Sequence, residues 1–366
     1  MGEAIRVLHL RSSNFVGGPE KQLLSHVDHV DRTRYAITLG SFLEGSQDNA
    51  FLSKASEGGI PTLGIRQKFV LDVSTLGPLR KALSEFDVVL THDYKATILT
   101  ILAKRPKHLG HGAYVRGWTA EQRRVHIYNA LEKIFLRRAD LVVTVADKKI
   151  AELIELGIPK DRIRVIPNAT LPAVMETPSR SLREEFEIPS NLPLFLTAGR
   201  FSSEKGQDVL MDALGCLKTP VAVVLFGDGP TLTQIKNRGQ GLAPHKIFFG
   251  GFRKSWHHHL PEATGLINPS RSEVMPNVVL EAMAHETPVV ATSVGGVPEI
   301  IDHEHTGILA PSENPEALAN AIQYLLDLND VDSLRSAAKE RVATHHTFEV
   351  QAKRMEALYE ELMGGA

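Results

Sequence analysis

Two carboxylates in the last third of the chain, Glu273 and Glu281, have a spacing that suits binding of a polar ligand. They lie in the stretch Asn268-Pro-Ser-Arg-Ser-Glu-Val-Met-Pro-Asn-Val-Val-Leu-Glu-Ala. The apolar residues 265–268 predict the end of a buried strand, and Pro276 suits the first turn of a helix. Glu273 then lies in the loop and Glu281 about one and a half turns into the helix. Carboxylates beside a helix N-terminus can accept hydrogen bonds from hydroxyls, while free backbone N–H groups attract an anion. A ligand with sugar hydroxyls and phosphates fits this arrangement; a capping acid and a surface glutamate are the alternative.

Two cations follow the strand predicted at residues 194–199. Arg200 leaves the end of this strand, and Lys205 comes five residues later in the loop before a helix. A diphosphate develops negative charge as its bond to a sugar breaks, and a forked Arg with a mobile Lys can stabilise that charge without a metal. The two residues therefore indicate a site for a diphosphate leaving group. A surface salt bridge with Glu204 or Asp208 is the alternative.

Two glycine-rich turns could also approach such a ligand. Gly17 and Gly18 follow the first strand, where they allow close backbone approach before a helix that Pro19 can open. We expect a phosphate-facing loop there, with a purely structural turn as the alternative. The loop has neither the G-x-G-x-x-G spacing of a dinucleotide site nor the pattern of a P-loop. In Phe248-Phe-Gly-Gly-Phe-Arg-Lys a similar turn could frame a nucleobase, with Arg253 at its rim.

Several histidines are candidates for binding. His92 and Asp93 end an apolar strand, and His111 precedes Arg116-Gly-Trp. A strand-end His that faces a cleft can bind substrate, and a structural His with its hydrogen bonds satisfied is the alternative. His257-His-His259 has no partner spacing that defines a metal site, so we expect a solvated loop there.

The totals place the chain among soluble globular proteins. At 366 residues two domains are expected, and the composition is 43% hydrophobic and 23% charged. No run of apolar residues is long enough to span a bilayer, and we find no secretory signal. The single cysteine, Cys216, fits a reducing compartment. We therefore expect a cytoplasmic protein.

Charge is distributed unevenly along the chain. Residues 1–175 carry 25 Lys and Arg against 18 Asp and Glu, whereas residues 176–366 carry 16 against 25. A basic half favours contact with an anion, for which phospholipid head groups, a lipid-linked acceptor or nucleic acid would all qualify. Residues 123–138 mix cations with apolar residues, so this predicted helix could lie on an anionic membrane. A helix packed on the sheet with a solvated basic face is the alternative.

Short apolar strands alternate with helical patterns throughout, which predicts an α/β fold with parallel sheets. A Pro-rich stretch at 171–190 is interpreted as a linker between an N-terminal domain (1–170) and a C-terminal domain (191–346). Two Rossmann-like halves facing a central cleft would place a ligand at the carboxyl ends of the strands. The expected strands include residues 7–10, 36–42, 88–91, 141–145, 194–199, 221–226, 246–249, 265–268 and 288–292, and the expected helices include 20–30 and 129–138.

Taken together, these stretches resemble the retaining glycosyltransferases of family 4, which have the GT-B fold. The resemblance runs nearly end to end. Its markers are Gly17-Gly18, Val165-Ile-Pro-Asn168, Gly199-Arg-Phe with Glu204-Lys-Gly206, Glu273-x7-Glu281, and Pro288-Val-Val-Ala-Thr-Ser-Val-Gly-Gly-Val-Pro-Glu.

The resemblance implies a nucleotide-sugar donor, a UDP- or GDP-sugar, held mainly by the C-terminal domain. Glu281 would accept the ribose hydroxyls, Glu273 would face hydroxyls of the donor sugar, and Arg200 and Lys205 would hold the diphosphate. The N-terminal domain would bind the acceptor, and a C-terminal helix at 347–362 would cross back onto it. No metal or other cofactor is implied. The implied donor-binding residues are Gly17, Gly18, Arg200, Lys205, Arg253, Glu273, Asn277 and Glu281.

The sequence departs from the family pattern at two places. Many relatives have Glu-Gly where this chain has Glu273-Val274, and many have a His where this chain has Arg116 before Gly-Trp-Thr. The role of that His is then absent, or is taken by His92 or His111. Arg116 could instead bind an anionic acceptor. The implied catalytic residues are Glu273, Arg200, Lys205 and His92, with Arg116 and His111 as candidates on the acceptor side.

The expected function is retaining transfer of a hexose-type sugar to a glycan or lipid-linked acceptor in polysaccharide or lipopolysaccharide-type biosynthesis. The protein would act in the cytoplasm and dock reversibly at the inner face of the membrane, without a nucleic-acid partner. A GT-B epimerase that acts on the sugar nucleotide is a close alternative. A nicotinamide-dependent oxidoreductase and a non-catalytic nucleotide- or glycan-binding module are alternatives from other classes.

Overall fold

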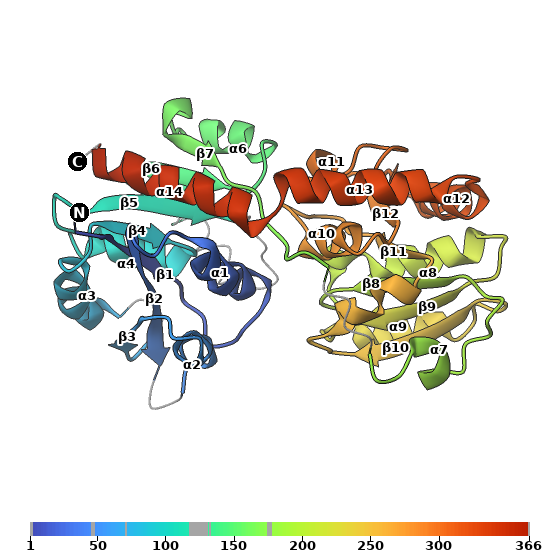
Figure 1. Cartoon of the computed structure of the whole chain (residues 1–366). Coiled ribbons are helices and arrows are strands. Elements are labelled where there is room, and N and C mark those ends of the chain that lie inside the picture. Colours follow the sequence, from blue (N-terminus) through green and yellow to red (C-terminus); the bar gives the residue numbers. More distant parts are fainter. Residues whose placement is uncertain are drawn as a thin grey trace. The chain divides into compact units, whose positions relative to one another are not determined.

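The computed structural model describes residues 3–44, 48–69, 72–116, 131, 133–173 and 178–364. These residues form two compact units (Figure 1). Unit 1 contains the chain up to Asn168 together with the C-terminal helix that begins at Phe348, and unit 2 contains Ala169–Thr347.

The described part of unit 1 is built on a seven-stranded sheet with the order β3-β2-β1-β4-β5-β6-β7, and each pairing is parallel. Its central strands are short, apolar and buried along their length, as expected for a parallel sheet covered on both faces. The strands are β1 (Ile5–Leu10), β2 (Tyr35–Glu44), β3 (Thr62–Gln67), β4 (Val88–Thr91), β5 (Gly110–Val115), β6 (Leu141–Thr144) and β7 (Ile163–Val165).

Helices cover the two faces of this sheet differently. Alternating residues of β1 point to opposite faces: Leu8 and Leu10 join an apolar cluster with α3 (Leu76–Leu83) and α4 (Tyr94–Leu102). His9 points to the other face, where α1 (Gly18–His29) packs against α14 (Phe348–Gly364). The remaining described helices of unit 1 are α2 (Ala50–Glu57), η1 (Val73–Thr75), α6 (Lys149–Glu155) and η2 (Lys160–Arg162).

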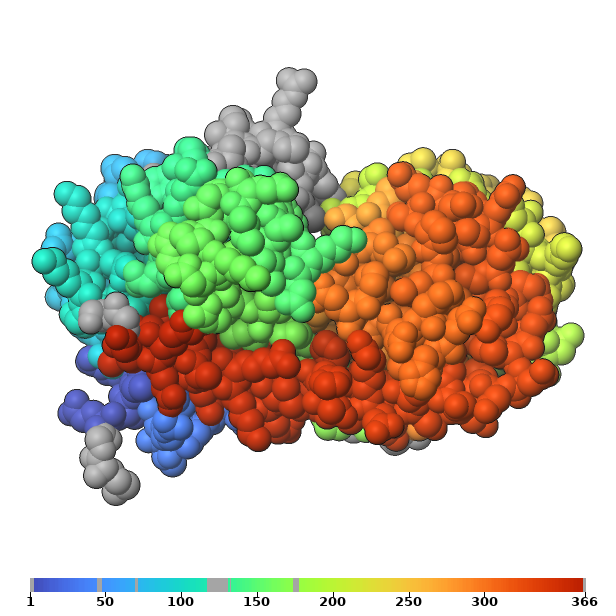
Figure 2. Space-filling view, turned by 90° about the horizontal axis from the view of Figure 1, so that it is seen from above, coloured from blue at the N-terminus to red at the C-terminus, as the bar shows by residue number. Residues whose placement is uncertain are grey.

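Helix α14 returns the C-terminal part of the chain to unit 1. In the space-filling view its residues, in red, lie against the green residues that include β7, where Arg164 forms an ion pair with Glu361 (Figure 2). Further along, Tyr35 on β2 donates a hydrogen bond of 2.9 Å to Glu360. The helix is therefore tied to strands that lie more than a hundred residues earlier in the sequence.

Unit 2 has a six-stranded parallel sheet among its described residues, in the order β10-β9-β8-β11-β12-β13. Its largest apolar cluster joins the sheet to α8 and α12. The strands are β8 (Leu194–Ala198), β9 (Ala222–Phe226), β10 (Lys246–Gly251), β11 (Gly265–Asn268), β12 (Val289–Thr292) and β13 (Ile308–Ala310). The described helices are α7 (Leu182–Glu185), η3 (Ser203–Lys205), α8 (Gln207–Cys216), α9 (Leu232–Gly239), η4 (Trp256–Glu262), α10 (Asn277–Ala284), α11 (Val297–Ile300), α12 (Pro315–Asp327) and α13 (Val331–His345).

The two parallel sheets with alternating helices confirm the predicted α/β class. Residues 178–190, interpreted from the sequence as part of a linker, instead belong to unit 2. The reason is local: Leu182 of α7 is completely buried, and its backbone N–H donates to the Glu262 carboxylate at 3.1 Å. Of the basic helix expected near residues 123–138, residues 123–130 and 132 lie outside the described residues.

No helix in the described ranges combines the length and the apolar character that crossing a bilayer requires.

Candidate active site

Each sheet has one place where the strand order reverses, and polar residues gather there in both units. In unit 1 this switch point lies between β1 and β4, and in unit 2 it lies between β8 and β11. Ligands of open α/β sheets bind outside the carboxyl ends of the strands at such a point. The residues that follow these four strands are therefore the first candidates for function.

In unit 2, Lys205 and Glu273 meet at the switch point. Lys205 follows β8 and Glu273 follows β11, and the Lys205 Nζ lies 2.7 Å from Glu273 Oε1. The Ser270 hydroxyl donates to the same carboxylate oxygen at 2.8 Å. The Glu273 side chain is 8% exposed and that of Lys205 27%, so the pair is sheltered but reachable. Arg200, exposed at the end of β8, adds a second cation on this edge.

Helix α10 begins immediately after this loop. Pro276, expected in the first turn, occupies the N-cap position and makes no side-chain capping hydrogen bond, and the first turn has no acidic residue. Asn277 is the first residue of the helix and Glu281 lies just over one turn further on, and both are partly buried. The backbone N–H groups at this end of the helix suit an anion.

The loop that carries Glu273 is shaped by the turn after β12. Gly295 has φ +53, and a Cβ there would lie 1.5 Å from the Glu273 carbonyl oxygen. The neighbouring Gly296 N–H donates to the Val274 carbonyl at 2.9 Å. The Gly-Gly turn thus fixes the backbone beside Glu273. The sequence marks it as a strand-end turn but does not show what it contacts.

Arg253 is bound within unit 2. Its Nη1 donates to Glu185 at 2.8 Å and its Nε to the Gly250 carbonyl at 3.0 Å, while the guanidinium lies 5.5 Å from the centre of the Phe226 ring. The hydrogen bond from Arg253 lowers the pKa of the Glu185 carboxyl. Because its charge is already paired, Arg253 is better placed to frame a planar group than to bind a phosphate.

The histidine run after β10 differs from the expected solvated loop. Residues 256–262 form η4, and His259 is buried with its ring stacked on Phe226 and its Nδ1 2.7 Å from Glu262. In the ranges that the structure describes, no group of three or more His, Cys, Asp or Glu is arranged to hold a metal ion.

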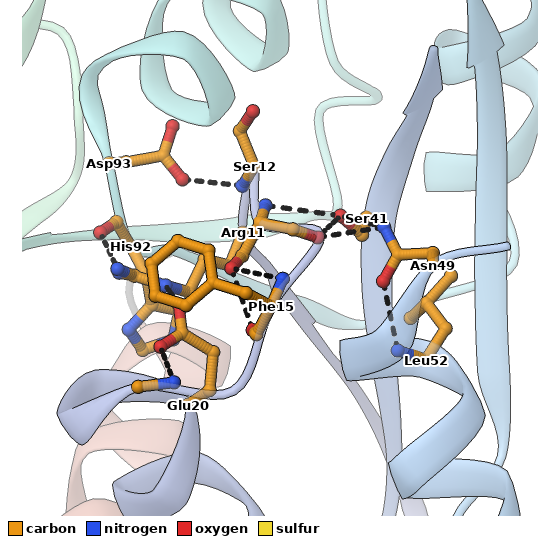
Figure 3. A network of polar contacts seen from close by, with 11 residues as sticks. Arg11, Ser12, Phe15, Glu20, Ser41, Asn49, Leu52, His92 and Asp93 are labelled. Carbon is orange, nitrogen blue, oxygen red and sulfur yellow. Dashed lines mark hydrogen bonds and ion pairs between the residues drawn. The ribbon is translucent and has the colours of Figure 1, made fainter. Parts of the chain in front are cut away.

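At the switch point of unit 1, a polar network joins the ends of β1 and β4 (Figure 3). Arg11 donates to Glu20 at 2.5 Å and to the His92 carbonyl at 2.9 Å, and the Ser12 N–H donates to Asp93 at 2.5 Å. Burial alone would raise the pKa of Glu20, but the charge and hydrogen bond of Arg11 lower it. The network holds the two strand ends in one conformation.

The predicted Gly17-Gly18 loop is part of this network. The Gly17 N–H donates to Glu20 Oε2 at 2.9 Å, and Gly18 is the exposed first residue of α1. A Cβ on Gly17 would lie 2.8 Å from the Phe15 ring. Glu20 and Arg11 are not among the residues predicted for the site, although Glu20 lies three residues after Gly17 and so has the capping-box spacing.

His92 ends a buried chain of four rings. His92 Nε2 lies 3.0 Å from His9 Nδ1, His9 Nε2 lies 2.9 Å from the Tyr359 hydroxyl, and that hydroxyl lies 2.7 Å from His26 Nε2. Burial lowers the pKa of all three histidines, well below the usual range for His9 and His92 and to about 4 for His26. The chain is therefore uncharged at neutral pH. Nothing in the sequence pattern indicated Tyr359, which lies 350 residues from His9.

The two candidates on β5 have different positions. His111 is the second residue of the strand and is completely buried; its Nε2 lies 3.0 Å from the Thr91 hydroxyl, and burial lowers its pKa to about 3. This position favours the structural alternative for His111. Arg116 lies at the other end, directly after β5, and its Nη1 donates to Asn168 Oδ1 at 2.9 Å.

A cavity of about 200 Å³ opens at the carboxyl ends of β1 and β2. Its lining is polar and contains two carboxylates but no Lys or Arg. The lining residues are Ser12, Ser13, Asn14, Phe15, Phe42, Leu43, Glu44, Asp48 and Asn49.

Two Rossmann-like units, each with a polar switch point, define a class of α/β proteins that bind ligands at strand ends. Sequence comparison identifies the family. The chain matches the family models Glycosyl transferases group 1 over residues 192–328 and Glycosyltransferase Family 4 over residues 16–170. It belongs to the family 4 glycosyltransferases of the GT-B fold.

Related proteins are similar to the chain over part of their length. A D-inositol 3-phosphate glycosyltransferase of Jonesia denitrificans is 33% identical over 177 residues, which are 44% of this chain and 42% of that protein. A GDP-mannose-dependent alpha-(1-6)-phosphatidylinositol monomannoside mannosyltransferase of Mycobacterium tuberculosis is 27% identical over 218 residues, 56% of this chain and 54% of that protein. The similarity thus spans about half the length of these relatives.

Solved structures resemble the whole chain. HepE of Anabaena in complex with UDP has a TM-score of 0.83 at 21% identity, covering 98% of this chain and all of that one. A glycosyltransferase from Rickettsia africae has a TM-score of 0.81 at 19% identity, with complete coverage of both chains. At these identities the likeness establishes the fold.

Proposed function

We propose that the protein is a retaining glycosyltransferase that moves a hexose-type sugar from a UDP- or GDP-sugar to a glycan or lipid-linked acceptor. The observation that carries this proposal is the meeting of Lys205 and Glu273, 2.7 Å apart, at the switch point of unit 2. Exposed Arg200 and the start of α10, where the N-cap residue is Pro276, lie on the same strand edge. A nucleotide-sugar offers phosphates and hydroxyls, which are the groups that these residues would bind.

The chemistry follows from where charge develops. As the bond between the anomeric carbon and the diphosphate breaks, negative charge grows on the phosphate oxygens and positive charge on the sugar ring. Arg200 and Lys205 stabilise the first, and the Glu273 carboxylate favours the second. Lys205 has three N–H donors, so it can keep its contact with Glu273 while it binds a phosphate oxygen. The acceptor hydroxyl then attacks the anomeric carbon from the face that the diphosphate leaves. The departing diphosphate helps to deprotonate this hydroxyl, and the anomeric configuration is retained.

The positive charge that the leaving group needs is supplied by side chains, so we propose that no metal or organic cofactor takes part. Glu281 would accept hydrogen bonds from the ribose hydroxyls, and Asn277 would contact the donor at the start of α10. The match to a GDP-mannose-dependent relative and the fold shared with a UDP complex support both nucleotides as candidates.

The relatives also support a place in glycan assembly. One similar protein, from Bacillus subtilis, is described as a putative teichuronic acid biosynthesis glycosyltransferase, 31% identical over 194 residues. We propose that the chain acts in the cytoplasm and contacts anionic membrane through its basic half. An epimerase acting on the sugar nucleotide remains the second candidate, because its donor site would use the same residues.

The test is product analysis with UDP- and GDP-sugars, with and without a panel of glycan and lipid-linked acceptors. If the protein transfers sugar, mass spectrometry should detect a glycosylated product only when an acceptor is present. NMR of that product should show the same anomeric configuration as in the donor. An epimerase would give a changed sugar without an acceptor, and either that result or an inverted linkage would contradict the proposal. Glu273→Gln should abolish transfer, whereas Glu313→Gln, an exposed acid paired with Arg271, should leave it unchanged.

A further inference from the structure

Arg116 is a partly buried cation without an acidic partner. Its guanidinium stacks 4.6 Å from the centre of the Tyr114 ring, and its hydrogen-bond acceptor is the neutral side chain of Asn168. The Nε atom is buried without a hydrogen-bond partner. Within the described ranges no carboxylate forms an ion pair with it.

Three other arginines of unit 1 have an acidic partner within ion-pair distance. Arg11 pairs with Glu20, Arg6 with Asp87, and Arg164 with Glu361. Glu20 is the acid whose charge reaches Arg116, but it already binds Arg11 and the Gly17 N–H. A cation withdrawn from water without an opposite charge is costly, and here the fold does not supply that charge.

The surroundings increase the positive potential at this point. Arg11 and Arg116 repel one another, and the charge of Arg116 helps to lower the pKa of His9 and His92. Tyr114 stacks on His92 on one side and on Arg116 on another, so the three side chains form a connected group at the carboxyl ends of β4 and β5. This is the edge of the sheet where ligands bind.

We propose that Arg116 binds an anionic group, a phosphate or a carboxylate, on the acceptor. This inference rests on the proposed function and specifies the acceptor class. A bidentate contact with the Arg116 guanidinium would place a negative charge beside this cation. It would also give hydrogen-bond acceptors to guanidinium N–H groups that have none among the described residues.

The donor diphosphate is the competing source of an anion, and the structure favours the acceptor. Unit 2 supplies Arg200 and Lys205 for the diphosphate at its own switch point, so Arg116 is not needed there. The cavity at β1 and β2 is a poorer place for an anion, because its described lining residues include Glu44 and Asp48, and the nearby Lys95 already pairs with Glu44 at 3.0 Å.

The experiment uses inorganic phosphate as the probe and ³¹P NMR of the full chain as the readout, since free phosphate is resolved from nucleotide signals. Phosphate affinity should fall about 10-fold or more in Arg116→Gln, the loss expected for a charge-assisted contact. The phosphate affinity of Arg116→Lys, which keeps the charge but loses the bidentate guanidinium, should lie between those of the wild type and Arg116→Gln. Arg6→Gln, which removes a paired surface arginine, is the matched control and should bind phosphate like the wild type.

Repeating the titration with saturating nucleoside diphosphate separates the two anion sources. Undiminished phosphate binding supports an acceptor site, whereas displacement would assign Arg116 to the donor and overturn the proposal. Equal phosphate affinity in wild type and Arg116→Gln would also overturn it. The phosphate titration does not depend on nucleotide binding. If no nucleoside diphosphate binds, the proposed function is contradicted, but the comparison of phosphate affinity between wild type and Arg116→Gln still tests the anion site.

Discussion

At the scale of single residues, the sites depend on groups whose charge state the fold controls. The chain of His92, His9, Tyr359 and His26 is uncharged because burial disfavours a proton that water would otherwise stabilise. An uncharged chain can still transmit hydrogen-bond direction, since each neutral imidazole has one donor and one acceptor nitrogen. The hydroxyl of Tyr359 therefore helps to determine which nitrogen of His92 carries the proton.

These lowered pKa values predict how the stability of unit 1 depends on pH. Unfolded His26 takes up a proton near pH 6.5, whereas folded His26 does so only near pH 4. Its contribution is thus fully present above about pH 6.5 and is lost as the pH falls toward 4, on the order of 3 kcal/mol. Thermal unfolding of unit 1 measured from pH 7 to pH 4 should show this decline.

The pH dependence should be weaker in His26→Asn, because the group that binds the proton in the unfolded state is gone. His303→Asn removes an exposed histidine and is the control, for which the slope should not change. A wild-type stability that is flat between pH 6.5 and pH 4 would contradict the neutral buried cluster.

At the scale of elements, the loops after neighbouring strands support one another. Glu273 follows β11, but the turn after β12 fixes its backbone, because Gly295 lies against the Glu273 carbonyl. Lys205 likewise reaches Glu273 from the loop after β8. Three strand ends therefore build the site, and a change in one loop should affect the residue held by another.

Gly295→Ala tests this coupling. The added Cβ would lie 1.5 Å from the Glu273 carbonyl oxygen, so the Glu273 loop must move. A displacement of about 1 Å at a reacting centre can reduce turnover about 100-fold, and we expect a loss of that order in kcat. Gly59→Ala is the matched control, since Gly59 has a similar φ of +69 but open space around it. Equal kcat values for both variants would show that the Gly295 contact does not position Glu273.

At the scale of the whole molecule, the sequence predicted the two sheets better than the contacts at their edges. Strands such as β9 and β11 are continuous apolar runs, and their predicted ranges agree with the structure to within a residue. Strand β5 was not predicted, because Gly110, His111 and Gly112 interrupt its apolar pattern. It is nevertheless buried along its length by tertiary packing.

Lys205 and Glu273 were both predicted to bind the donor, but the sequence did not predict their contact with each other. The local alternative for Lys205 was a bridge to Asp208, but in the structure Asp208 pairs with Arg271. Contacts between residues this far apart depend on strand order, which one sequence does not reveal. The contacts of Tyr359 with His9 and of Asn168 with Arg116 were not predicted for the same reason.

The central claim is that unit 2 binds a nucleoside diphosphate through Glu281, and calorimetric titration with UDP, GDP and ADP tests it most directly. We expect micromolar binding of one of the three nucleotides. This binding should be lost in Glu281→Ala and retained in Glu316→Ala, which replaces an exposed glutamate in the first turn of α12. The nucleotide that binds would also identify the donor series. Absence of binding by all three, or equal binding by Glu281→Ala and wild type, would contradict the assignment of the donor site.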